Sequence, residues 1–184
     1  MYIASQKHKE NIAEYLLYMW QVEDIIRANN LEIERIKENV IAKFNLDSAH
    51  EKEITEWYES LIDMMRRENV EKSGHLQLNK NVIIQLTDLH IALLKDSRFS
   101  EYGAEFYKVL PFIVELRAKA GENPPDEIET CFNALYGMLM LRLQGKDVTP
   151  ETQNAIKQIS KFIALLSKDY HLDREDKLFP HDED

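Results

Sequence analysis

Glycine and proline are scarce in this chain, with five of each among 184 residues. A β-rich fold needs many tight turns, and those turns depend on these two residues. Most of them also fall between apolar periodic segments, the exceptions being Gly103, Pro111 and Gly137. The scarcity therefore predicts long helices rather than a turn-rich β fold.

Cysteine is almost absent, since Cys131 is the single one in the sequence. One cysteine cannot close an intrachain disulfide, and it cannot build a structural zinc site. Its neighbours Phe132, Ala134 and Leu135 are apolar. We therefore expect a buried and unreactive thiol.

Positive charge is also in short supply. Lys and Arg number 23 against 33 Asp and Glu, which gives a formal net charge of −10. This balance disfavours nucleic acid and anionic membrane surfaces as partners. The longest uncharged apolar stretches, such as 136–141, are too short to span a bilayer, and residues 1–10 contain no apolar signal core. We expect a cytoplasmic protein.

Several catalytic and cofactor motifs are missing. The glycine spacing excludes the dinucleotide-binding G-x-G-x-x-G turn, the phosphate-binding loop and the G-x-S-x-G nucleophile elbow. None of the six histidines has a Glu three residues before it, as helical di-iron sites require, and H-E-x-x-H is absent. The sequence therefore predicts no cofactor and no metal, and it favours a non-enzymatic protein.

Apolar residues recur at spacings of three and four along most of the chain, which is the pattern of amphipathic helices. This pattern predicts an all-α fold, an irregular bundle of six to seven helices in a single domain of residues 1–175. Residues 176–184 form an acidic tail that we expect to fray. The expected helices span about 6–28, 31–44, 49–73, 79–95, 100–120, 126–145 and 150–172.

Helix ends have recognisable signals. Ser48 and Glu51 have the S-x-x-E spacing of a capping box. Thr149 followed by Pro150 combines an N-cap residue with proline at the first helical position. Pro111 lies inside an expected helix, and we expect it to kink that helix or shift its start.

The expected helix 126–145 is apolar on nearly every side. Such a helix is either the central helix of the bundle or lends one side to a subunit interface, and we expect helix 126–145 to be central. Gly137 lowers its helix propensity by about 1 kcal/mol, which suggests that a neighbouring helix crosses closely there. Ala134, Met138 and Leu141 are the candidate interface residues.

One polar cluster stands out on the first expected helix. Glu23 falls in the middle of an apolar face, and Arg27 lies at the edge of that face beside Trp20. A buried carboxylate that stays charged and unpaired costs several kcal/mol. Arg27 is the nearest candidate partner, followed by Arg117 and His90 on the apolar faces of other helices. The cluster is either a structural ion-pair network or a pocket for a small polar ligand.

Two segments, 10–27 and 132–143, resemble a family of short, single-domain proteins from gut-type anaerobic bacteria. That family is known as a domain of unknown function. The resemblance covers most of the chain and implies a bacterial, cytoplasmic, helical protein. It assigns no functional residue.

Two hypotheses for function follow. The first is a non-enzymatic helical interaction or scaffold module that self-associates through Ala134, Met138 and Leu141. The second is a small-molecule binder or hydrolase with a site in the polar cluster. Its candidate ligand-binding residues are Glu23, Arg27, Trp20, His90 and Arg117.

Overall fold

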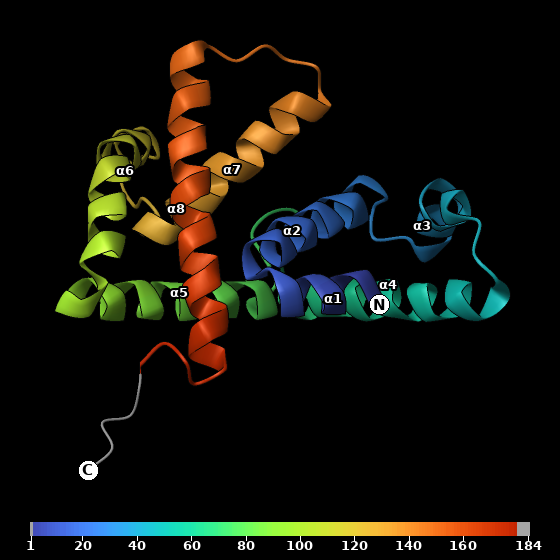
Figure 1. The fold of residues 1–184 in the computed structure, drawn as a ribbon. Coiled ribbons are helices and arrows are strands. Elements are labelled where there is room, and N and C mark those ends of the chain that lie inside the picture. Colours follow the sequence, from blue (N-terminus) through green and yellow to red (C-terminus); the bar gives the residue numbers. More distant parts are fainter. Residues whose placement is uncertain (1, 180–184) are drawn as a thin grey trace. The chain divides into compact units, whose positions relative to one another are not determined.

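The computed structural model describes residues 2–179, and every regular element in that range is a helix (Figure 1). The predicted all-α class is confirmed. The chain divides into two compact units. Unit 1 comprises residues 1–10 and 14–82, and unit 2 comprises residues 11–13 and 83–184.

The elements follow one another along the chain as α-helices with two short 3-10 helices, η1 and η2. They are α1 (Tyr2–Glu10), α2 (Ile12–Ala28), α3 (Ile33–Asn39), η1 (Ile41–Phe44), α4 (Ser48–Arg67), α5 (Gln77–Lys95), η2 (Ser97–Phe99), α6 (Ser100–Lys119), α7 (Glu127–Leu143) and α8 (Pro150–Arg174).

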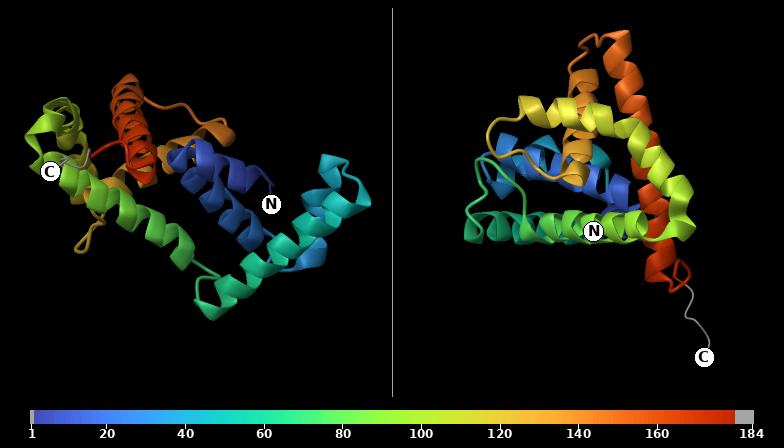
Figure 2. Two further views of the ribbon diagram at one scale, coloured as in Figure 1. Left: turned by 60° about the horizontal axis from the view of Figure 1, so that its bottom comes forward. Right: turned by 90° about the vertical axis from the view of Figure 1, so that its left-hand side faces the viewer.

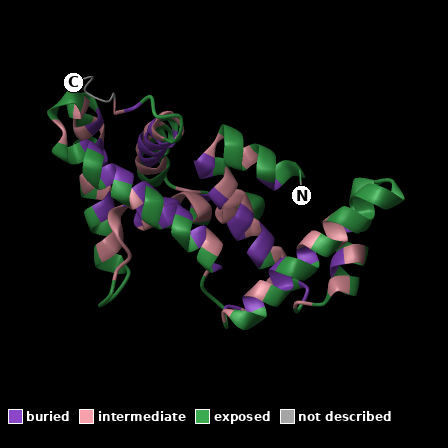
Figure 3. Ribbon diagram, turned by 90° about the horizontal axis from the view of Figure 1, so that it is seen from below, coloured by how far each residue is buried: buried purple, intermediate pink, exposed green. Residues whose placement is uncertain are grey.

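Unit 1 is built around one apolar core that α2, α3, η1 and α4 share. These elements are the blue to teal helices in Figure 2. The helix α4 shows why: its buried residues recur at spacings of one, three and four, so they form one face, while its other face is exposed (Figure 3). The segment after α4 adds two apolar side chains to the same core. Core members include Met19, Val22, Ile26, Ile36, Ile41, Tyr58, Leu61, Ile62, Met65, Val70 and Leu76.

Within unit 2, the helices α6, α7 and α8 each pack against the other two. In Figure 1, α8 is the long orange-to-red helix and α7 lies beside it. Aromatic rings fill part of this core, with Phe162 lying 5.5 Å from Tyr102 and 5.7 Å from Phe106 between ring centroids. The apolar faces of these helices therefore pack as the periodicity predicts.

The first expected helix, 6–28, is interrupted in the structure. It forms two helices, α1 and α2, which Asn11 separates. The Asn11 side chain explains the break because its Oδ1 accepts hydrogen bonds from the Ala13 N–H and the Ser167 hydroxyl. An Asn side chain that bonds the backbone two residues on competes with helix continuation. The expected helix 31–44 is likewise divided, into α3 and η1.

Three helix-end signals were predicted from the sequence. One agrees with the structure, and the other two differ from it. Thr149 caps α8 with Pro150 at its start, as predicted. At α4 the capping residue is Asp47 rather than Ser48, and the Asp47 carboxylate accepts from the backbone N–H groups of Ala49 and His50. Pro111 lies inside α6, which continues as one helix across it. Of the two outcomes expected at Pro111, a kink or a shifted helix start, the shifted start is therefore wrong.

Helix α7 is more exposed to solvent than we expect for a helix with apolar residues on all sides. A β-carbon built at Gly137 would meet no heavy atom within 4 Å, so the expected close crossing of a neighbouring helix at this glycine is wrong. Met138 is buried within the chain, whereas Ala134 and Leu141 are half-buried and Leu143 is exposed. Met138 therefore has little surface to offer to a partner.

The beginning of the expected tail packs on the rest of the chain. Leu178 is buried, and the ring of Phe179 lies 5.4 Å from that of Phe99. Residues 180–184, the remainder of the expected tail, lie outside the described residues.

Candidate functional site

Glu23 is fully buried on α2, with 0% exposure, and its carboxylate has three hydrogen-bond partners. A buried carboxylate needs polar partners, and Glu23 has them. They are not the residues that the sequence predicts. Its oxygens lie 2.6 Å from Nδ1 of His75, 2.9 Å from the backbone N of Leu76 and 2.6 Å from Nδ2 of Asn79.

These partners lie at the start of α5. The first N–H groups of a helix lack intrahelical acceptors, and the helix dipole is positive there. Glu23 accepts from Leu76, the residue before α5, and the Glu68 carboxylate accepts from the first α5 residue, Gln77, at 2.6 Å. Two carboxylates therefore cap α5, and one of them comes from α2.

Arg27 makes contacts separate from those of Glu23. Its guanidinium lies 2.9 Å from the Asp24 carboxylate and donates to the backbone carbonyls of Val70 and Gly74. The direct Glu23–Arg27 ion pair that the sequence suggests is therefore not formed. Both side chains instead fasten the connection between α4 and α5 onto α2.

His75 is the partner that the sequence analysis missed. His75 follows Gly74, which has a left-handed backbone with φ of +85°. Because this segment is not helical, helical periodicity cannot predict the direction of the His75 side chain. Its ring stacks on Trp20, with centroids 4.1 Å apart, and its side chain is 26% exposed. The available signal was weak, a histidine four residues before the expected helix start at 79.

His90 and Arg117 belong to unit 2 and have partners there. Nδ1 of His90 lies 2.7 Å from the hydroxyl of Tyr102, and burial lowers the pKa of His90 against the opposing charges of Glu127 and Asp126. Arg117 lies 3.1 Å from the Glu127 carboxylate. The predicted cluster thus divides into Trp20, Glu23 and Arg27 in unit 1 and these two residues in unit 2.

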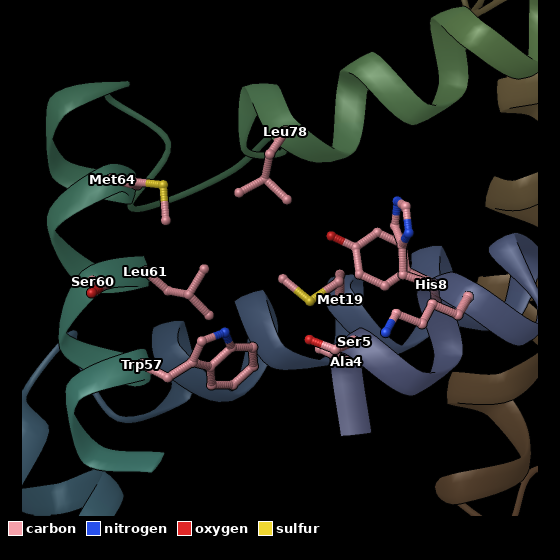
Figure 4. A pocket seen from close by; sticks show the side chains of 11 residues that line it. Ala4, Ser5, His8, Met19, Trp57, Ser60, Leu61, Met64 and Leu78 are labelled. Atoms are coloured by element: carbon pink, nitrogen blue, oxygen red, sulfur yellow. The ribbon is translucent and has the colours of Figure 1, made fainter. Parts of the chain in front are cut away.

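Unit 1 also contains a pocket of about 340 Å³, here called the α1–α4 pocket. It has walls from α1, α2, α4 and the start of α5 (Figure 4). Neither Glu23 nor Arg27 lines it. The lining residues are Ala4, Ser5, His8, Lys9, Tyr15, Met19, Trp57, Ser60, Leu61, Met64 and Leu78.

The α1–α4 pocket lies along the same face of α2 as Glu23. Tyr15 and Met19 line it, and they precede Glu23 by two turns and one turn of helix. Burial raises the pKa of Tyr15, and the negative charge of Glu23 raises it further. Leu78, on the pocket's other side, lies one residue before Asn79 on α5. The Glu23 cluster therefore holds part of the pocket wall in place.

The chain matches one family model, described as "Domain of unknown function (DUF4924)", over residues 1–177. It belongs to this family. No curated protein and no solved structure matches the chain. Within the described part of this DUF4924 protein, no helix is both long enough and apolar enough to cross a bilayer.

A second hollow of about 550 Å³ in unit 1 of this DUF4924 protein has a different character, because acids surround it. Several of these acids already have partners, with Glu32 lying 2.8 Å from Arg35 and Glu34 lying 2.9 Å from Lys37. No group of three or more His, Cys, Asp or Glu residues within 2–179 is arranged to hold a metal ion. The hollow is lined by Leu31, Glu32, Ile33, Glu34, Glu59, Ile62, Asp63 and Arg66.

Proposed function

We propose that this protein binds a small, largely apolar molecule in the α1–α4 pocket. The observation that carries the proposal is a cavity of about 340 Å³ whose walls all belong to unit 1. Small-molecule sites have volumes of roughly 300–1,000 Å³, with mostly apolar walls and a few polar groups that set orientation. The pocket has both features.

The residues of the pocket suit such a ligand. Trp57 offers a flat apolar face, and Met19 and Met64 have flexible thioethers that adapt to different shapes. The polar groups are few, and they come from Ser5, His8, Lys9, Tyr15 and Ser60. Because Glu23 fixes the start of α5, we infer that the wall at Leu78 is formed before a ligand arrives.

Methyl-labelled methionine reports on the pocket directly. Octanol, a neutral amphiphile, should shift the NMR signals of the Met19 and Met64 methyl groups as it is added. The Met138 and Met140 methyls belong to unit 2 and serve as internal controls, which should not shift. If neither octanol nor its carboxylate analogue octanoate shifts the Met19 and Met64 signals, the proposal is overturned.

A pocket-filling variant gives a second test. Ser60 lines the pocket and is exposed, so Ser60→Phe places a ring there with little effect on folding. The expected result is weaker octanol binding. Asn154→Phe is the matched control because Asn154 is exposed on α8 and lies outside the pocket. Equal weakening by both variants would argue against binding in the pocket.

Self-association, the first hypothesis from the sequence, is the second candidate function. What supports it is a set of exposed apolar side chains in unit 2, which includes Tyr107 and Val114, seven residues apart on one face of α6. A cytoplasmic interaction module would present such a face to a second copy of the chain. Native mass spectrometry, which reports the number of subunits, tests this candidate.

A further inference from the structure

We infer that the ligand of the α1–α4 pocket carries a negative charge at one end and that Lys9 binds this charge. The inference rests on the proposed function, and it adds the chemical class of the ligand: a compact amphipathic anion. The pocket's polarity, the charges around it and its volume support it independently.

The polarity of the pocket changes from one side to the other, apart from the Ser60 hydroxyl on α4. Figure 4 shows Ser5 and His8 of α1 on one side, while Trp57, Leu61 and Met64 of α4 lie on the opposite side. An amphipathic molecule satisfies both sides at once, because its apolar body is removed from water while its charged end keeps polar partners. The head group is therefore placed at α1 and the apolar body against α4.

The charges at the pocket favour an anion. None of the described residues that line it is Asp or Glu, although the chain as a whole has a net charge of −10. Lys9 has no ion-pair partner within residues 2–179, whereas Lys7 on the same helix lies 2.9 Å from the Glu14 carboxylate. Lys9 is thus available to bind a negatively charged ligand.

Two nearby features oppose an anion. The negative charge of Glu23 acts on Tyr15, but the Glu23 carboxylate is itself compensated by its three hydrogen-bond partners. The C-terminal end of α1 also has the negative end of the helix dipole, which Lys7 and Lys9 in the last turn offset. Neither feature leaves an uncompensated negative charge at the polar side of the pocket.

The volume limits the size of the ligand. A cavity of about 340 Å³ corresponds to roughly eleven water volumes of about 30 Å³ each. A molecule of about ten non-hydrogen atoms fits this space. Octanoate is such a molecule, and octanol and octylamine share its apolar chain but have a neutral and a positive head group.

Calorimetric titration with these three compounds tests the inference. We expect octanoate to bind more tightly than octanol and octylamine to bind most weakly. Lys9→Met keeps the apolar stem and removes the charge, so it should weaken octanoate binding by about two- to fivefold and weaken octanol binding by less than that. Lys7→Met makes the same change in net charge outside the pocket, and it should leave both affinities unchanged.

The outcomes separate the inference from the proposed function. If octanol and octanoate both fail to shift the Met19 and Met64 methyl signals, the proposed function falls and the inference falls with it. If all three compounds bind equally and Lys9→Met has no effect, the pocket stands and the anionic ligand is ruled out. If Lys7→Met weakens octanoate binding as much as Lys9→Met does, a general charge effect replaces the assigned role of Lys9.

Discussion

Two histidines, one in each unit, differ in their exposure to water and in the charge of their partners. In unit 1, His75 is 26% exposed, stacks on Trp20 and faces the buried Glu23 carboxylate. In unit 2, His90 is 3% exposed and faces the neutral hydroxyl of Tyr102 among the rings of Phe106 and Phe162. One ring has a charged partner and access to water, and the other has neither.

The difference lies in what each cluster does for the fold. Around Glu23 a carboxylate is buried, and it is tolerated because a helix start, an amide and a histidine surround it. Around His90 burial lowers the pKa, so the ring is held in its neutral form and packs as an aromatic residue. The Glu23 cluster fastens one segment to another, while the His90 cluster fills a core.

The largest effect is expected at Glu23. Glu23→Ala leaves the Leu76 N–H and the Asn79 amide without their acceptor in a buried site, and we expect a loss of about 3–5 kcal/mol in unfolding free energy. Chemical denaturation measures it. Asp24→Ala is the control, because Asp24 is exposed and its ion pair with Arg27 contributes less than about 1 kcal/mol. A loss at Glu23 no larger than that of the control would contradict the capping role.

A middle-sized effect is expected at Tyr102. Tyr102→Phe removes the hydroxyl that faces His90 and leaves a buried ring nitrogen unpaired, at a cost of about 1–3 kcal/mol. Tyr107→Phe serves as the matched control, since Tyr107 is exposed on the same helix and should change stability by less than about 0.5 kcal/mol. Urea midpoints of the two variants would show whether the hydroxyl matters beyond the ring.

The smallest effect is a dependence on pH. Burial lowers the pKa of His90 in the folded chain, so below its ordinary value of 6.5 the unfolded chain binds the proton more readily. Stability from this residue is therefore present above pH 6.5 and is lost as the pH falls, by less than about 1.4 kcal/mol per pH unit. His90→Gln, which cannot titrate, should lose less stability than the native chain between about pH 7.5 and pH 5.5.

This comparison of the native chain with His90→Gln cancels the groups that titrate in both proteins. Urea denaturation at the two pH values provides the measurement. Equal losses in both proteins would mean that His90 does not contribute to the pH dependence.

Much of the fold could be predicted from the sequence because helical periodicity averages over many residues. Helix starts that depend on a strong local signal were placed well, as Thr149 and Pro150 show for α8. Breaks that depend on one side chain were not. Asn11 ends α1 through a contact with Ser167, more than 150 residues further along the chain, and no local pattern contains that partner.

The candidate site could be predicted in part for a similar reason. Glu23 was conspicuous because a carboxylate on an apolar face needs an explanation. Its actual partners come from the connection between α4 and α5, where side-chain direction has no period. The α1–α4 pocket was not predictable at all, since a cavity is a property of how α1, α2, α4 and α5 are placed against one another.

The short connection between α4 and α5, residues 68–76, has no regular structure, yet α2 holds it through Glu23 and Arg27. Surface connections of this kind usually tolerate inserted residues. Here an inserted residue would move the backbone groups of Val70 and Leu76 away from Arg27 and Glu23, their hydrogen-bond partners on α2. A tag or reporter domain is better accommodated at 144–149, between α7 and α8, where exposed residues predominate.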